Sequence, residues 1–198
     1  IKFFLCGLAT ALLFPPFFLT PLGFIIFPYL FYLFNHSEYK SLSYIKNFIS
    51  GFLYGLGFCI IYLIWIKEPF LLDEATKNFS FLSYLLIIYC SFFYGICFIF
   101  LKLINRMTIK IIIFPSLFIL AEYICANLSF GFPWISFAMV HSSNSLGSII
   151  IFYFGTYGLS YLTILFFLFP VIFLLKKNDL FKFFIFVYFF FFIFIFSL

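Results

Sequence analysis

The feature that most constrains this chain is a series of long apolar segments that carry no formal charge. Residues 3–34 contain no Asp, Glu, Lys or Arg, twenty uncharged residues separate Lys46 from Lys67, and twenty-four separate Lys77 from Lys102. At about 1.5 Å of rise per residue, a helix of ~20 residues crosses the ~30 Å apolar core of a bilayer. Only 9% of the residues are charged, against roughly 25% in a soluble domain. The sequence therefore excludes a water-soluble globule and predicts an integral membrane protein.

The residues that interrupt these segments predict an all-α fold, a polytopic membrane helical bundle of about seven transmembrane helices. Pro15-Pro16 breaks the first segment into a helical hairpin. Gly131, Pro133 and a Ser/Asn-rich run favour a loop between two later spans. The expected spans are residues 1–14, 20–35, 47–66, 79–101, 111–128, 147–175 and 183–198.

The distribution of basic residues predicts the orientation of the bundle. If the N-terminus is cytoplasmic, nine of the 11 Lys and Arg residues fall in segments on the inner side, and only Lys67 and Lys77 fall in outer loops. Cytoplasmic loops are enriched in Lys and Arg, so we expect a cytoplasmic N-terminus and a C-terminus on the outer face.

The basic residues lie singly or in small groups between apolar runs, which argues against nucleic-acid binding.

Three residue types within the spans allow narrower expectations. Gly51 and Gly55 are four residues apart, which favours close helix packing but is also compatible with chance. The aromatic residues, 28% of the chain, are interpreted as mostly lipid-facing. The cysteines lie in apolar runs without CxxC spacing, so we expect inert packing rather than disulfides or a zinc site. They are Cys6, Cys59, Cys90, Cys97 and Cys125.

The predicted outer loops contain the residues of most interest. Trp65 and Trp134 lie at span ends, where indole rings commonly settle at the level of the lipid headgroups. Glu122 is a carboxylate within an apolar run, which indicates either a buried hydrogen bond or contact with a substrate. His141, in a Ser/Asn-rich loop, is expected to be solvated.

We find no G-x-S-x-G, HExxH or phosphate-binding motif, and expect no metal and no cofactor.

The order of these residues resembles that of a known family. Glu122-Tyr123-Ile124-Cys125 followed by Gly131-Phe132-Pro133-Trp134 resembles the membrane domain of bacterial apolipoprotein N-acyltransferases, whose pattern is a Glu, an Arg three residues later and a GFPW box. Three other stretches, residues 7–22, 51–65 and 155–160, are similar in order and spacing, so the resemblance covers essentially the whole chain. Cys125 stands where the family usually has Arg, which removes an ionic partner of Glu122, and His141 stands where Gln is common.

The resemblance implies an activity whose catalytic groups lie outside this chain. The family transfers an acyl chain from a phospholipid to the N-terminal diacylglyceryl cysteine of bacterial lipoproteins, through a Glu-Lys-Cys triad in a nitrilase-like domain. We expect that domain after Leu198, so the sequence is interpreted as a fragment that is inactive alone, beginning at Ile1. The implied role of these residues is to anchor that domain, as a monomer in the bacterial inner membrane, and to form a lipid entrance.

The residues that the resemblance assigns to substrate binding are the GFPW box and the carboxylate that precedes it. They are Gly131, Phe132, Pro133, Trp134 and Glu122. No catalytic residue is expected in this chain. The alternative is a non-enzymatic polytopic protein, such as a small transporter or a channel subunit, for which the absence of visible catalytic motifs is equally natural.

Overall fold

The computed structural model describes residues 1–35, 43–104, 106–128, 131–143 and 145–171, and in these ranges the chain is helical without strands. The expected all-α fold is confirmed. Four helices are long and apolar enough to cross a membrane, and two shorter apolar helices precede them. The expected span over residues 183–198 lies outside the described ranges, so the figure of about seven spans is approximate.

The first two helices form a hairpin around the proline pair. Helix α1 (Lys2–Ala11) is followed by a turn, the short 3-10 helix η1 (Thr20–Leu22) and helix α2 (Gly23–Asn35). Pro15-Pro16 lies in the turn, as the sequence predicted. Within the turn the Leu19 N–H donates to the Leu12 carbonyl at 2.9 Å, which brings its two ends together.

Helix α4 (Tyr44–Tyr62) packs closely against both α1 and α6 (Leu82–Ile99). A Cβ at Gly51 would lie 2.7 Å from the Phe98 Cβ, and one at Gly55 would lie 2.9 Å from the Ser91 Cα. Real Cβ atoms do not approach other atoms this closely, so both glycines are required by the packing. The predicted close-packing face is therefore confirmed. A second glycine contact was missed: Gly7 of α1 lies against the Tyr54 carbonyl of α4.

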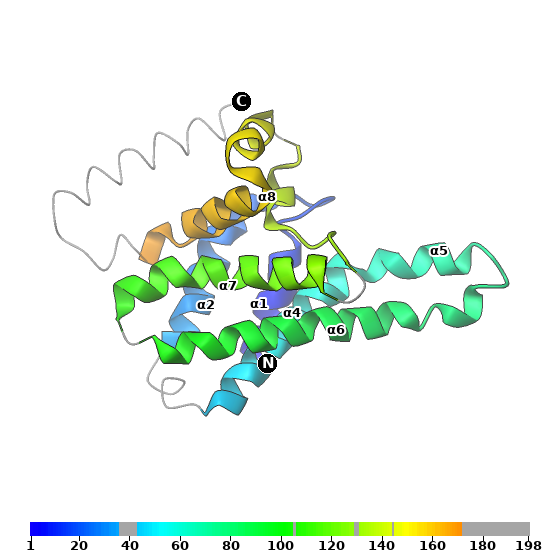
Figure 1. Ribbon diagram of the computed structural model, residues 1–198, viewed down its shortest axis with the longest axis horizontal. Coiled ribbons are helices and arrows are strands. Elements are labelled where there is room, and N and C mark those ends of the chain that lie inside the picture. The colour runs from blue at the N-terminus through cyan, green and yellow to red at the C-terminus, as the bar shows by residue number, and fades with distance from the viewer. Residues whose placement is uncertain (36–42, 105, 129–130, 144, 172–198) are drawn as a thin grey trace.

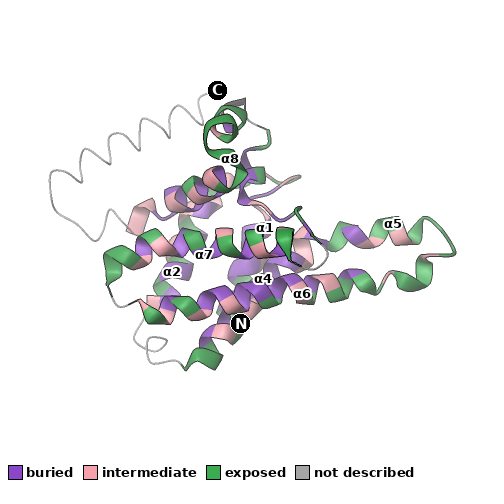
Figure 2. Cartoon of the chain, viewed as in Figure 1, coloured by how far each residue is buried: buried purple, intermediate pink, exposed green. Residues whose placement is uncertain are grey.

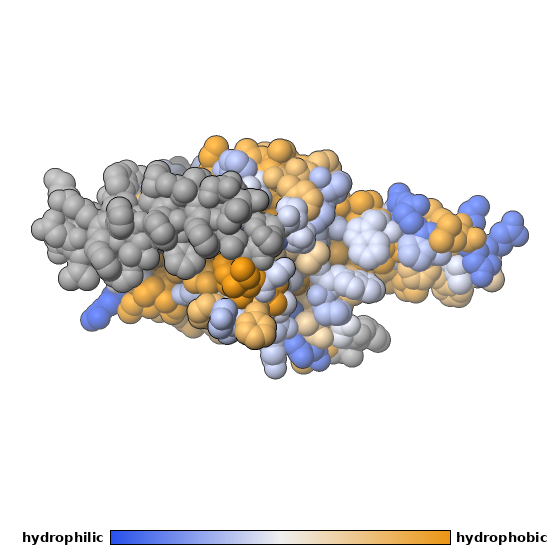
Figure 3. Space-filling view, turned by 90° about the horizontal axis from the view of Figure 1, so that it is seen from above, coloured by the Kyte–Doolittle hydropathy of each residue, from blue (hydrophilic) through white to orange (hydrophobic). Residues whose placement is uncertain are grey.

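A helical hairpin projects beyond the rest of the bundle (Figure 1), and we call residues 63–82 the outer hairpin, after the side of the membrane that the basic residues predict for it. It contains η2 (Ile64–Ile66), α5 (Lys67–Leu71), η3 (Lys77–Phe79) and the beginning of α6, which continues into η4 (Phe100–Leu103). The visible surface is largely apolar, and hydrophilic residues gather at the tip of the hairpin (Figure 3).

The last described helices flank the loop that contains the GFPW box. Helix α7 (Met107–Asn127) is followed by that loop, by the 3-10 helix η5 (Phe137–His141) and by α8 (Ser145–Phe167). At Gly155 the backbone adopts φ 70° and ψ 175°, so α8 is two helical segments joined at a kink. A side chain would be strained at this φ, which explains the glycine.

Two side-chain contacts join helix ends at one end of the bundle. The Lys110 Nζ donates to the Asn35 Oδ1 at 2.9 Å, which joins the start of α7 to the end of α2. The Lys102 Nζ lies 4.7 Å from the centre of the Tyr44 ring, which joins the end of α6 to the start of α4. These contacts agree with helices that alternate in direction along the chain. The assignment of basic residues to inner and outer segments requires the same alternation.

Buried residues lie mainly on the helix faces that meet inside the bundle (Figure 2), and phenylalanines make up a large share of them. The fully buried phenylalanines are Phe14, Phe27, Phe31, Phe58, Phe98, Phe114, Phe118, Phe137 and Phe167. The interpretation of the aromatic residues as mostly lipid-facing is therefore wrong for a large part of them. In a bilayer the lipid and the protein core are both apolar, so composition alone does not separate the two environments.

Candidate functional site

The GFPW box lies in a loop that leaves α7 and turns back into the bundle. Gly131 has a φ of 56°, a left-handed conformation that favours glycine. The next N–H, that of Phe132, donates to the carbonyl of Cys125 in the last turn of α7 at 2.8 Å. The chain therefore reverses directly over the helix end, and Phe132 is buried whereas Gly131, Pro133 and Trp134 are exposed.

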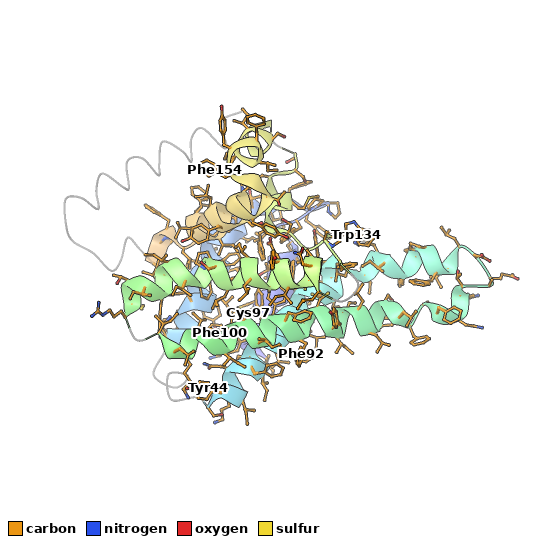
Figure 4. The ribbon with its side chains drawn as sticks, viewed as in Figure 1. Tyr44, Phe92, Cys97, Phe100, Trp134 and Phe154 are labelled. Carbon is orange, nitrogen blue, oxygen red and sulfur yellow. The ribbon has the colours of Figure 1, made fainter. Side chains whose placement is uncertain are left out.

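Trp134 contacts Trp65 at the base of the outer hairpin. The two ring centroids are 5.7 Å apart with an angle of 60° between the planes. The Tyr62 hydroxyl donates to the Trp134 carbonyl at 2.9 Å, across 72 residues of sequence. Figure 4 shows Trp134 beside the point where the hairpin leaves the bundle. We call Trp65 and Trp134 the tryptophan pair.

Glu122 lies beneath this loop rather than on its surface. Its side chain is 1% exposed, and its Oε1 accepts the backbone N–H of Phe137 at 2.6 Å. The Oε2 atom is buried and has no hydrogen-bond partner among the described residues. The structure therefore shows the buried hydrogen bond considered for Glu122, and the carboxylate is not at the surface.

The Phe137 ring occupies the centre of the aromatic core. It contacts the rings of Phe14, Phe27, Phe58 and Phe118, with centroids 5.2, 5.8, 5.8 and 5.6 Å away respectively. These rings come from the first turn and from α2, α4 and α7. Sequence reasoning did not single out Phe137, because nothing in the sequence distinguishes one of 40 phenylalanines from another.

Hydroxyl groups of α8 bind the other side of the loop. The Ser160 Oγ accepts the Ala138 N–H at 2.9 Å and lies 3.2 Å from the Ser136 Oγ. The residues from Ser136 to Ala138 are therefore held between α7 and α8. Ser160 belongs to residues 155–160, one of the stretches whose order and spacing resemble the family.

His141 is buried, so the expectation of a solvated histidine is wrong. It is 9% exposed, and its Nε2 lies 3.0 Å from the Thr163 Oγ1. The Thr163 hydroxyl donates its own proton to the Leu159 carbonyl at 2.7 Å, so Nε2 carries the hydrogen and donates to Thr163. Burial lowers the pKa of His141 to about 4, because it disfavours the charged form.

The described residues offer no visible reaction centre. All five cysteines are buried within the bundle as free thiols, and a nucleophilic thiol must be accessible and ionised. The part of the chain that the structure covers has no group of three or more His, Cys, Asp or Glu side chains that could hold a metal. What the site does offer is a loop held by buried hydrogen bonds, with an exposed aromatic rim.

The geometry brings together some of the predicted residues and separates others. Phe132 and Trp134 are in edge-to-face contact, with centroids 4.9 Å apart and planes at 86°. Glu122 acts on the same loop from inside, through Phe137. Sequence reasoning missed the contact between the two tryptophans and the role of Tyr62, because both depend on the packing of distant segments.

Comparison with known proteins provides one assignment. No curated protein matches the chain. The family described as "Apolipoprotein N-acyltransferase N-terminal domain" matches residues 6–168, a range that includes the GFPW loop, the outer hairpin and all the helices described above except the first residues of α1. This match covers most of the chain and contains every contact on which the site depends. The chain therefore belongs to the apolipoprotein N-acyltransferase N-terminal domain family.

Proposed function

We propose that this chain is the membrane part of an enzyme that transfers an acyl chain from a phospholipid to the N-terminal diacylglyceryl cysteine of bacterial lipoproteins. The observation that carries the proposal is the GFPW loop, which is fixed from within by Glu122 and Ser160 and presents Trp134 at the surface. Family membership supports an acyltransferase rather than a transporter or channel subunit.

In this proposal the chain holds lipids and supports the catalytic domain but does not carry out the chemistry. Acyl transfer through a thioester needs an activated thiolate with a base nearby, and four of the five cysteines here are fully buried, at 0% exposure. The nucleophile, its Glu and Lys partners and the nitrilase-like domain that carries them are expected to follow Leu198, as a region of roughly 250 residues.

The proposed location is the bacterial inner membrane, with the GFPW loop and the outer hairpin on the outer face. Nine of the 11 basic residues then lie in inner segments, as the positive-inside rule requires. The tryptophan pair, with Phe132 and Pro133 beside it, would line the lateral entrance through which the phospholipid and the lipoprotein reach the catalytic thiol. Glu122 would keep that entrance in shape.

Mass spectrometry of lipoprotein N-termini tests the function. In cells depleted of the protein, the N-terminal cysteine of lipoproteins should keep its diacylglyceryl group, and its α-amino group should remain free instead of being acylated. Expression of the wild-type gene should restore the third acyl chain. If lipoproteins remain fully N-acylated after depletion, the proposed function is wrong.

A further inference from the structure

The tryptophan pair has features that an ordinary belt of interfacial aromatic residues does not need. Trp65 is 48% exposed and Trp134 is 55% exposed, yet their rings contact each other from segments far apart in sequence. Tryptophans that only anchor a protein at the headgroup level are stable singly, around the perimeter. Contact between two half-exposed indoles indicates a surface whose shape is set by the packing of these two segments.

The position of this surface is fixed by neighbouring groups on both segments. The Tyr62 hydroxyl holds the Trp134 carbonyl at 2.9 Å, and the Phe132 ring packs edge-to-face with the Trp134 indole. Phe132 is itself 9% exposed and is anchored to α7 through its backbone. Binding at such a surface loses little conformational freedom, because its rings are already ordered before a ligand arrives.

We propose that the tryptophan pair binds a primary ammonium group. The face of an indole ring carries negative charge density and attracts a cation within about 6 Å of its centroid. The two indole planes are inclined at 60° with centroids 5.7 Å apart, and at this separation a cation placed between the two faces lies within that distance of both centroids. The nearest formal charges along the chain balance each other, because the Lys67 Nζ lies 3.7 Å from the Glu68 Oε1.

This inference rests on the proposed function and specifies the substrate chemistry of the same site. Two groups that fit are the headgroup of phosphatidylethanolamine, as acyl donor, and the free α-amino group of the diacylglyceryl cysteine, as acceptor. Both are primary ammonium ions near neutral pH. N-acylation converts the acceptor into a neutral amide, so the product loses the charge that the pair binds and is released.

The sequence makes the test selective, because the chain has only two tryptophans and both belong to the pair. Tryptophan can be replaced biosynthetically by its mono-, di- and trifluorinated analogues, which weaken the negative face while leaving the shape of the ring nearly unchanged. Binding of dihexanoyl phosphatidylethanolamine to the chain in neutral maltoside micelles is then measured by calorimetry. We expect the affinity to fall stepwise, by about threefold to tenfold over the series, as the loss of a cation–π contact predicts.

Matched ligands distinguish the two possible sources of the ammonium group from each other. They also distinguish ammonium binding from general lipid contact. Dihexanoyl phosphatidylglycerol, which has no ammonium group, should show no dependence on fluorination. A diacylglyceryl-cysteine peptide with a free amine should behave as phosphatidylethanolamine does if it is bound here, and its N-acetylated form should not. A response with only one of the two amines identifies the source. Equal responses to phosphatidylglycerol and phosphatidylethanolamine, or no dependence on fluorination with either amine, would overturn the proposal.

A variant pair provides a second measurement. Trp65→Leu should reduce the affinity for the ammonium ligand, whereas Phe152→Leu, at an aromatic residue that is 82% exposed elsewhere on the surface, should not change it. Equal losses in the two variants would indicate general lipid contact and contradict the proposal. Because binding is measured without turnover, this result is independent of whether lipoproteins are the acceptor.

Discussion

The carboxylate of Glu122 and the backbone N–H of Phe137 form a buried hydrogen bond of 2.6 Å that connects α7 to the loop after it. The bond places the Phe137 ring among four other phenylalanine rings and leaves Trp134, three residues earlier, at the surface. A contact inside the bundle thus helps to position a rim residue outside it.

Replacing Glu122 tests how firmly this bond holds the loop. Glu122→Gln keeps an oxygen that can accept the Phe137 N–H, and we expect only a small loss of stability. Glu122→Leu leaves that N–H unpaired in an apolar interior, which costs about 1–3 kcal/mol. Thermal unfolding in micelles and limited proteolysis of residues 131–141 measure both effects. Equal behaviour of the Gln and Leu variants would show that the hydrogen bond does not hold the loop.

The central position of Phe137 predicts a large effect of its truncation. Phe137→Ala removes a fully buried ring and should destabilise the protein by about 3–5 kcal/mol, the usual range for such cavities. The matched control is Phe152→Ala, since Phe152 is 82% exposed. Its effect on thermal unfolding should be within about 0.5 kcal/mol. Similar losses for the two variants would contradict the placement of Phe137 at the core.

The buried His141 predicts a loss of stability in mild acid. Its pKa is about 4 in the folded protein, against about 6.5 in an unfolded chain. As the pH falls from 7 to 5, the unfolded state takes up a proton that the folded state does not. The free energy of unfolding should therefore decrease, by about 2 kcal/mol at pH 5.

The control for this prediction is His141→Gln, which retains an N–H donor for Thr163 but does not titrate. Unfolding of the wild type and the variant is compared at pH 7 and pH 5. The decrease with acid should be clearly smaller in the variant. If the two proteins lose equal stability, other groups are responsible for the pH dependence.

The orientation predicted from the basic residues is tested with single introduced cysteines. An impermeant maleimide should label Glu74→Cys, in the outer hairpin, in intact cells. It should label Arg106→Cys, between α6 and α7, only after the membrane is permeabilised. The native cysteines are buried and should give little background. Labelling of both positions from the same side would exclude the predicted topology.

Much of the architecture was determined by the sequence through local and compositional effects. The uncharged runs required membrane helices, and Pro15-Pro16 marked the turn after the first of them. The Gly51/Gly55 spacing favoured a close helix contact, and the structure shows that its partner is α6. Of the site, the sequence contained Glu122 and the GFPW box in recognisable order. These features could be predicted because each depends on residues near one another in the chain.

The tertiary structure alone decided which of these residues meet. The contact of Trp65 with Trp134, the burial of His141 against Thr163 and the central position of Phe137 all join segments that are distant in sequence. In a soluble protein the alternation of polar and apolar residues would mark the buried faces. Here the lipid-facing and core-facing sides of each helix are both apolar, so the choice between them is made by shape complementarity and by the few buried hydrogen bonds, which only the packed bundle reveals.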